Sequence, residues 1–423
     1  MTNHEQLQTA LKLVWSELPA MLGDRMNAFE TTLLTLLRRL DRAPLDALSV
    51  DAVLTMLERD YPKVYERMVE AMAERTVDVA FRSTSGAVRS NVGRYVVVPV
   101  WYATDREDTG SNDPGARYSG NRGALHFGRV EVSIPDSHKH EKGKLEKPRW
   151  FRLEFREDPE KHVLMVTLEP SDATAWKGEV KQKLAGCSKR DLLLFIHGYN
   201  VDFETAALRA AQFAHDMEFQ GLALLYSWPS EGAVLKYMVD EDNAQWSVDD
   251  FEVVLNTLMT ELGAECVHAV AHSMGNRVLA EGIRRMDVAA LPSDAARLRE
   301  VIFAAPDINA DTFRKFAEKF SNRASRFTLY VSNADIALSA SQKAHKYPRA
   351  GDSGDGVVLS EGLETIDASA VDKNFLGHSY FCDNRVVLQD MFNLIMEGQS
   401  AAKPRFGLKE QITPEGRYWA MQP

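Results

Sequence analysis

The sequence predicts an α/β protein in which a mostly parallel sheet is covered by helices on both faces and is preceded by a small helical bundle. From residue 191 onward, short continuous apolar segments alternate with segments of helical period. Such alternation is typical of β-α-β units, and continuous apolar runs are typical of parallel strands that are buried on both faces. Before residue 83 the apolar spacing is helical throughout. Around Ser273, a strand, a sharp turn and a helix follow one another directly.

Residues 1–82 form one predicted unit. Their apolar side chains recur every three or four residues, as in Leu7, Leu11 and Leu18, which share one helical face. We interpret this bundle as an interaction or oligomerisation module, with a lid over the following domain as the alternative. Residues 83–93 are small and polar and form the predicted linker.

The main domain is expected to span residues 94–398 and to begin with strands. Its first part contains four predicted strands and two predicted surface loops: strands at 95–102, 130–134, 150–155 and 163–168, with a Gly/Ser/Asn-rich loop at 104–123 and a charged loop at 136–147. Its second part alternates strands at 192–196, 222–228, 301–305, 327–331 and 363–366 with helices at 204–217, 248–262, 311–320 and 386–396. Residues 399–423 are a predicted C-terminal extension.

Composition and charge exclude several classes of function. Hydrophobic residues make up 45% of the 423-residue chain, which is enough for a sizeable core. The formal net charge is −11 and Lys and Arg form no concentrated stripe, so we expect no nucleic-acid partner. No apolar run approaches the roughly 18 residues of a membrane span, and no basic segment followed by an apolar one precedes the domain. We therefore expect a cytoplasmic protein without stable membrane insertion.

The central motif is the turn at Ser273. An apolar run that starts at Val267 meets this serine, and a helix-period pattern takes over at Asn276. A serine at such a turn projects its hydroxyl clear of the sheet, and the N–H of the next residue points into the same space. Ala271 stands where glycine is usual, but Gly275 keeps the second small position. The motif predicts that Ser273 is a nucleophile.

A serine nucleophile needs a base and an acid that orients the base. In an open parallel sheet these residues should follow the carboxyl ends of strands. Asp335 follows the strand at 327–331, and His378 lies between the last strand and the last helix of the domain. The chain order Ser273, Asp335, His378 is that of a known type of serine-hydrolase triad.

Each of these two assignments has alternatives. Asp307 and Asp367 also follow strands and could provide the acid. His345 and His272 are alternative bases, although His272 is too near Ser273 in sequence to reach over it. Asp335 and His378 remain the predicted pair.

Two backbone N–H groups should stabilise the oxyanion of such a reaction. We assign them to Met274, directly after the nucleophile, and to Tyr199, in the 197–200 turn that follows the strand at 192–196. Trp228 and Tyr237 are candidate walls of the substrate pocket.

Several separate motifs now point to one family. They are 99–106 (PVWYATDR), 128–135 (GRVEVSIP), 195–200 (FIHGYN), 226–229 (YSWP), 271–276 (AHSMGN), 305–307 (APD) and Gly377-His378. With these motifs, residues 98–396 resemble the bacterial alpha/beta hydrolases grouped as domain of unknown function nine hundred within the esterase/lipase superfamily. The resemblance implies an ester-type hydrolase and leaves the substrate open; the N-terminal bundle lies outside it.

The predicted function is therefore that of a serine hydrolase that cleaves carboxylic esters through an acyl-enzyme, with an ester or lipid-like small molecule as substrate. This chemistry needs no metal and no organic cofactor. The charged segments 138–141 and 352–356 contain metal-ligand residue types but not a complete ligand set. The alternative hypothesis is a catalytically silent hydrolase-fold scaffold that acts by binding a protein partner, or a second copy of itself, through residues 1–82.

Overall fold

The computed structural model describes residues 61, 63–64, 95–136, 138, 159–231, 237–320, 322–333, 347–353, 357–371, 384–401, 405 and 407–422. Contacts along the chain separate two compact units, residues 1–93 with 146–162 and residues 94–145 with 163–423. The sheet and its helices belong to the second unit. Nearly all of the predicted N-terminal bundle, and the whole linker at 83–93, lie outside the described residues.

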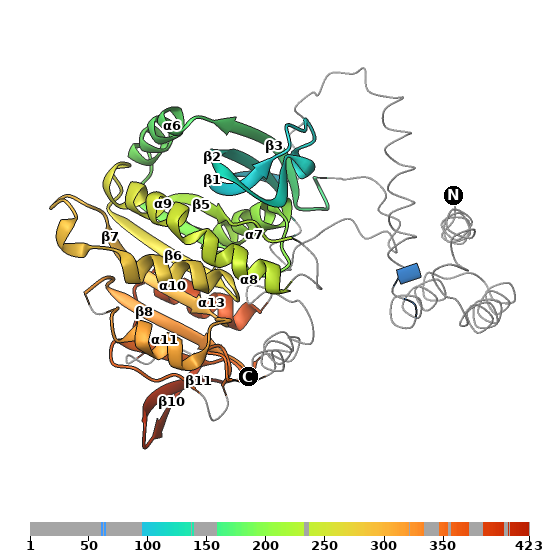
Figure 1. The fold of residues 1–423 in the computed structure, drawn as a ribbon. Helices are drawn as coiled ribbons and strands as arrows, with labels where there is room; N and C mark the ends of the chain where they lie inside the picture. The colour runs from blue at the N-terminus through green and yellow to red at the C-terminus, as the bar shows by residue number, and fades with distance from the viewer. Residues whose placement is uncertain are drawn as a thin grey trace, which may run out of the picture. The chain divides into compact units, whose positions relative to one another are not determined.

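One eleven-stranded sheet forms the centre of this unit (Figure 1). Its strands are β1 (Tyr95–Asp108), β2 (Tyr118–Pro135), β3 (Leu164–Ser171), β4 (Asp191–Ile196), β5 (Leu222–Ser227), β6 (Cys266–His272), β7 (Arg297–Ala304), β8 (Arg326–Val331), β9 (Leu363–Asp367), β10 (Leu408–Thr413) and β11 (Gly416–Met421). Their order across the sheet is β10-β11-β9-β8-β7-β6-β4-β5-β1-β2-β3.

The middle of the sheet is parallel, as predicted. All neighbours from β1 through β5, β4, β6, β7, β8 and β9 to β11 pair in parallel. Antiparallel pairs occur at the two ends, where β2 and β3 extend one edge and β10 extends the other. The continuous apolar strands fit this arrangement because every residue of β4 and β5 is buried.

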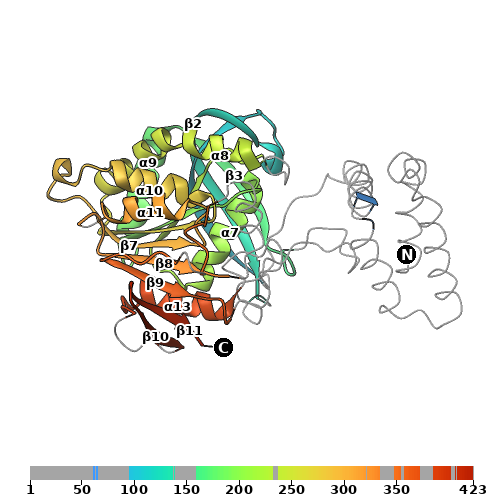
Figure 2. The ribbon, with the colours of Figure 1, turned by 60° about the horizontal axis from the view of Figure 1, so that its bottom comes forward.

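Helices cover both faces of the sheet (Figures 1 and 2). Side chains of α7 (Phe203–Asp216) and α13 (Arg385–Ile395) join one buried cluster. The opposite cluster contains side chains of α6 (Ala173–Ala185), α8 (Tyr237–Trp246), α9 (Val248–Thr260), α10 (Gly275–Arg285) and α11 (Ala310–Ala317). Strand β4 divides between them: Leu192 and Leu194 join the second cluster, whereas Leu193 and Phe195 join the first.

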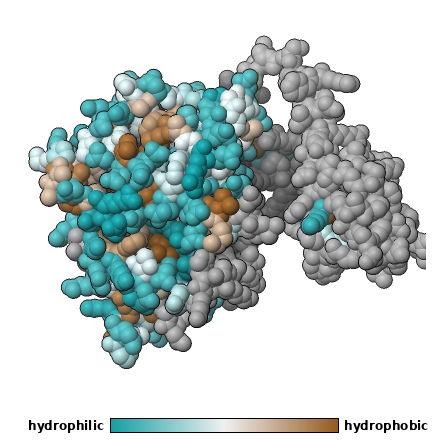
Figure 3. All heavy atoms as spheres, in the orientation of Figure 1, coloured by the Kyte–Doolittle hydropathy of each residue, from teal (hydrophilic) through white to brown (hydrophobic). Residues whose placement is uncertain are grey.

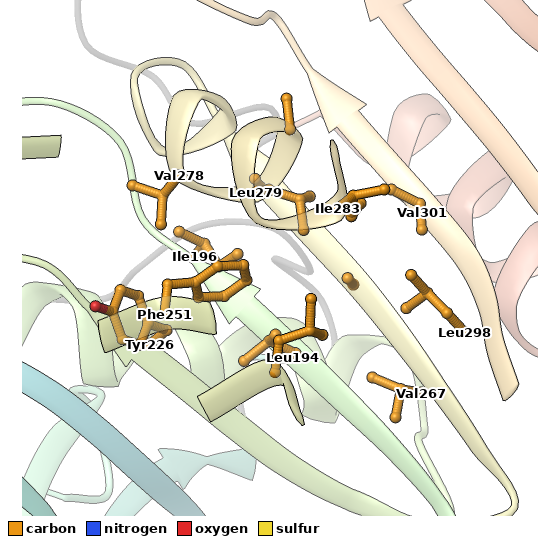
Figure 4. Packing of buried hydrophobic residues seen from close by; sticks show 14 of the residues in the cluster. Leu194, Ile196, Tyr226, Phe251, Val267, Val278, Leu279, Ile283, Leu298 and Val301 are labelled. Carbon is orange, nitrogen blue, oxygen red and sulfur yellow. The ribbon is translucent and has the colours of Figure 1, made fainter. Parts of the chain in front are cut away.

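Figure 4 shows how α9 and α10 pack on the central strands. Phe251 of α9 and Leu279 and Ile283 of α10 are fully buried over β4 and β6. A Cβ atom at Gly282 would lie 2.5 Å from the Phe251 ring, so only glycine lets the two helices approach at this point. Each such fully buried large apolar side chain contributes about 2 kcal/mol to folding.

The structure corrects two predictions about local structure. The loop expected at 104–123 is shorter than predicted: β1 continues to Asp108 and β2 begins at Tyr118, so only residues 109–117 connect the strands. The polar composition of this segment suggested a surface loop, but Thr104, Asp105 and Arg106 are buried among polar partners within the sheet.

Helices α6 and α8 were not predicted, although Asp172 caps α6 by accepting from two N–H groups of its first turn. The predicted strand at 150–155 lies outside the described residues.

The face of this unit seen in Figure 3 is mostly hydrophilic, with small separate apolar patches. Such scattered apolar groups are usual on a protein surface. Among the described residues, no helix combines the length and the apolar character needed to cross a membrane.

Candidate active site

The candidate site lies at the carboxyl ends of β4 and β6, which are neighbours in the sheet. The chain leaves β4 toward β5 on one side and leaves β6 toward β7 on the other. The loops after β4 and β6 therefore part in opposite directions, and such a switch point is where open parallel sheets bind ligands. The loop at 197–201 and the turn at 273–274 are these two loops.

Ser273 occupies the sharp turn that the sequence predicts. Its φ angle is +47°, in the left-handed region that L side chains rarely adopt. The turn is fixed by its backbone: the Ser273 N–H donates to the Ala304 carbonyl at 3.0 Å, and the Ser273 carbonyl accepts from the N–H groups of Asn276 and Asp307 at 3.2 Å. The Asn276 side chain adds hydrogen bonds to the carbonyls of Ser273 at 2.9 Å and Ala304 at 3.0 Å. A strained backbone that neighbouring bonds hold so completely is typical of a functional turn.

Two glycines let the β4 loop approach this turn. A Cβ atom at Gly275 would lie 2.2 Å from the carbonyl oxygen of His197. A Cβ atom at Gly198 would lie 2.8 Å from Nδ1 of His272 and 3.2 Å from Cβ of Ser273. The backbone after β4 thus lies directly against the candidate nucleophile.

The residues predicted to form an oxyanion hole flank this contact. Tyr199 follows Gly198, and Met274 follows Ser273. Met274 is buried, and its N–H has no hydrogen-bond acceptor among the residues that the structure describes. A buried N–H without an acceptor is rare and calls for a ligand or water.

Two partly exposed aromatic side chains belong to the 197–201 loop and to α8. The rings of Tyr199 and Tyr237 meet edge to face with centroids 5.5 Å apart, and both side chains are partly exposed. Trp228 is fully buried, so its prediction as a pocket wall is wrong. It stacks on the His197 ring at 5.0 Å and donates from Nε1 to the His197 carbonyl at 2.8 Å, which places it behind the loop.

Neither predicted partner of Ser273 is within the described residues: Asp335 and His378 both lie outside them, as does the alternative base His345. The other alternative base, His272, lies beside Gly198. Burial, followed by the charge of Arg209, lowers the pKa of His272 to about 3. A ring with this pKa is a poor general base near neutral pH.

The alternative acids are described and have other partners. Asp307 is buried and lies in an ion pair with Arg349, with 3.1 Å between Oδ1 and Nε, and it accepts a 2.5 Å hydrogen bond from Tyr237. Asp367 accepts from the N–H and the hydroxyl of Ser369 at the end of β9. Both carboxylates therefore have partners other than an imidazole.

Behind the loop at 197–201 lies a buried polar network that the sequence did not predict. Arg106 is 1% exposed; its Nη2 donates to the Val201 carbonyl and lies 3.3 Å from Nε2 of His197, so it contacts both ends of the loop. Asp240 of α8 is fully buried and accepts from the N–H of Asn200. In the sequence, the only sign of this network is that Arg106 closely follows an apolar strand. A charged residue in that position is equally typical of the start of a surface loop.

The segments considered for metal binding have structural partners where they are described. His138 is buried, and its Nε2 lies 3.0 Å from Oδ1 of Asp216. Across the described ranges, no group of three or more His, Cys, Asp or Glu side chains could hold a metal ion. Residues 354–356 of the second segment lie outside those ranges.

Comparison with known proteins agrees with this geometry. The family model for the alpha/beta hydrolase of unknown function (DUF900) matches residues 172–396, from the start of α6 to the end of α13. The motifs between residues 98 and 171 precede this match. No curated protein matches the sequence significantly. Since the model covers more than half of the chain, the protein belongs to this family of alpha/beta hydrolases.

Proposed function

We propose that the protein is a serine hydrolase that cleaves carboxylic esters through an acyl-enzyme. Ser273 attacks the ester carbonyl, and His378 takes its proton and later gives it to the leaving alcohol. Asp335 orients His378, and the N–H groups of Met274 and Tyr199 stabilise the oxyanion. Water then attacks the acyl-enzyme and releases the acid and the free serine.

The observation that carries this proposal is the strained turn at Ser273, held at the switch point against the backbone of Gly198. A strained serine between a strand and a helix, with a second loop directly beside it, is the arrangement that acyl transfer needs. The N–H of Met274, which has no acceptor among the described residues, supports its role in the oxyanion hole.

The choice of Asp335 as the acid is supported by the surroundings of its main alternative. The Asp307 carboxylate is already bound by Arg349 and Tyr237, so it would have to lose buried partners to hold an imidazole. Asp335 follows β8 in the chain, two strands from β6 in the sheet.

Esters are proposed rather than amides because an alkoxide leaves more readily than an amine and so makes a smaller demand on the acid that protonates it. Tyr199, next to Gly198, and Tyr237 of α8 supply partly exposed ring surface, which suits an acyl chain or an aromatic ester. The N-terminal residues 1–82 are proposed to bind a protein partner or a second copy of the chain. Size-exclusion chromatography of the full-length protein over a range of concentrations tests self-association.

The enzymatic proposal is tested by intact-mass analysis after incubation with a fluorophosphonate, with hydrolysis of short and long p-nitrophenyl esters measured in parallel. Wild type, Ser273→Ala and Asp335→Asn are compared. Ser188→Ala is the matched control, because Ser188 is exposed and precedes β4, at the opposite edge of the sheet from Ser273.

A single adduct on wild type and on Ser188→Ala, absent from Ser273→Ala, is expected. Turnover by Asp335→Asn should fall by about 10²- to 10⁴-fold. Folded wild-type protein without adduct and without turnover would contradict the proposal and favour a scaffold that acts through residues 1–82.

A further inference from the structure

Arg106, at the end of β1, is tied to both ends of the loop at 197–201 although it precedes the loop by about 90 residues in the chain. Its Nη2 donates to the Val201 carbonyl at 2.7 Å and lies 3.3 Å from Nε2 of His197. Its Nε donates to the hydroxyl of Ser227 at 2.9 Å, and its Nη1 donates to the carbonyls of Ser230 and Ser119 at 2.9 and 3.2 Å. All five N–H groups of the guanidinium are thus directed at named acceptors.

His197 is a suitable acceptor for this arginine. Burial, followed by the charge of Arg106, keeps the pKa of His197 well below its ordinary value, so the ring is neutral. We assign its proton to Nδ1, which lies 2.8 Å from the Gly198 carbonyl. The lone pair of Nε2 then faces Arg106 at 3.3 Å and the Ser227 hydroxyl at 3.2 Å, with the Trp228 carbonyl 3.1 Å from the same nitrogen. The ring thus joins the start of the loop to the guanidinium.

Asp240, from α8, holds the other half of the loop. Its Oδ2 accepts from the N–H of Asn200 at 3.3 Å and from the hydroxyl of Ser230 at 2.5 Å. The hydroxyl oxygen of Ser230 in turn accepts from the N–H of Val201 at 3.1 Å. Asn200 has a φ angle of +58°, so Asp240 and Ser230 stabilise a loop conformation that is unfavourable by itself.

These contacts fix the residues on both sides of Tyr199. Gly198 before it lies against Ser273, and Asn200 and Val201 after it are bound by Asp240 and Arg106. A backbone donor stabilises an oxyanion only if it is fixed in place before the reaction, because a displacement of about 1 Å can cost about 100-fold in rate.

We propose that Arg106 and Asp240 are positioning residues that fix the 197–201 loop so that the Tyr199 N–H is preorganised for the oxyanion. This inference rests on the proposed function. It assigns the two residues no contact with substrate. Their loss should therefore lower the rate of acylation and leave substrate binding nearly unchanged.

The test compares Arg106→Met, Arg106→Lys and Asp240→Asn with wild type and with Arg405→Met. Arg405 is the matched control because it is also a buried arginine, with Nε 3.0 Å from Asp390 of α13 and Nη1 bonded to the Gln399 carbonyl, away from the loop. Two readouts are measured on the full chain: kcat and KM for p-nitrophenyl acetate, and hydrogen–deuterium exchange of the peptide that contains residues 197–201.

In Arg106→Met, kcat should fall about 10- to 100-fold while KM stays within about 2-fold, since loss of one oxyanion donor costs about 10²- to 10³-fold. Arg106→Lys should recover little, because an ammonium cannot reach the dispersed acceptors of a guanidinium. Asp240→Asn, which keeps the shape of the side chain, should lower kcat about 3- to 10-fold by the same mechanism. Exchange at 197–201 should rise in all three variants and remain at the wild-type rate in Arg405→Met.

The proposal is overturned if kcat in Arg106→Met falls no further than in Arg405→Met, or if exchange at 197–201 is unchanged. Should Arg106→Met fail to fold, Asp240→Asn decides by the same two criteria. If wild type itself neither reacts with a fluorophosphonate nor hydrolyses esters, the proposed function fails. In that case the exchange measurement still shows whether the two residues fix the loop.

Discussion

Asp307 and Arg349 form a buried ion pair beside the turn at Ser273, with 3.1 Å between Oδ1 and Nε. Both side chains are almost fully buried, and the N–H of Asp307 donates to the carbonyl of Ser273. The pair thus anchors the segment after β7 to the strained turn. In this position Asp307 stabilises the turn, which is a different task from orienting a catalytic histidine.

The first prediction follows from this pair. Asp307→Asn should lower the free energy of unfolding by about 3 kcal/mol, because it leaves the charge of Arg349 buried without a counter-charge. It should lower kcat by less than about 10-fold, far less than Asp335→Asn. Urea denaturation and ester turnover of the two variants give the comparison. A kcat that collapses in Asp307→Asn and survives in Asp335→Asn would reverse the assignment of the acid.

The second prediction concerns Gly275. Alanine there would place Cβ 2.2 Å from the His197 carbonyl oxygen, so the loop at 197–201 must move away from Ser273. Gly275→Ala should therefore lower kcat by at least about 10-fold and destabilise the fold by about 2 kcal/mol. Turnover and thermal unfolding measure both effects.

Gly178 provides the matched control for this substitution. It lies within α6, and a Cβ atom there meets no atom within 4 Å. Gly178→Ala should stabilise the fold by about 0.5–1 kcal/mol through helix propensity and leave kcat unchanged. Equal effects of the two substitutions would contradict the close approach at Gly275.

The third prediction concerns Asn276, whose side chain donates to the carbonyls of Ser273 and Ala304. Asn276→Ala removes both hydrogen bonds and should destabilise the fold by about 2 kcal/mol. It should also lower kcat, since these bonds help hold Ser273 at its positive φ. Rates of fluorophosphonate labelling and urea denaturation are the measurements. Reduced stability with an unchanged labelling rate would show that the backbone bonds alone hold the turn.

The fourth prediction concerns the pH dependence of stability. Burial raises the pKa of Asp105 to about 7, although Tyr226 donates a 2.9 Å hydrogen bond to it. Below about pH 4 the folded and unfolded chains both hold this proton. As the pH rises from about 4 to 7 the unfolded chain releases it first, so stability is progressively lost, by on the order of 4 kcal/mol. Asp105→Asn should remove this part of the decline.

The measurement is the free energy of unfolding of wild type and Asp105→Asn at several pH values between 4 and 8. The difference between the two isolates Asp105, because Glu300, whose pKa burial also raises to about 7, is present in both. Glu107→Gln is the control. Glu107 is exposed, and hydrogen bonds from Asn121 and Ser119 lower its pKa, so its contribution to stability rises with pH, whereas that of Asp105 falls. Parallel curves for wild type and Asp105→Asn would show that Asp105 is ionised in the folded protein.

The sequence by itself determined the class of fold and the sharp turn at Ser273. These features are local in the sequence. Apolar runs and helical periods predict the strands and helices, and the small residues around Ser273 predict the sharp turn between a strand and a helix. The prediction failed at 104–108 and 118–123, which belong to two paired strands, and the side chains of Thr104, Asp105 and Arg106 are buried against Tyr226 and Ser227 from a distant segment. Composition cannot distinguish such buried polar strand residues from those of a surface loop.

The turn at 197–200 was expected beside Ser273, but only the tertiary structure decided the strand order that brings it there and the buried residues that hold it. β6 pairs with β4 although β5 comes between them in the chain, and this strand order brings Gly198 against the serine. β1 joins the sheet beside β5, which brings Arg106 to the back of the same loop. Such pairings depend on which strands exclude the most apolar surface from water together. That is a property of the whole packed sheet and of no single segment of the chain.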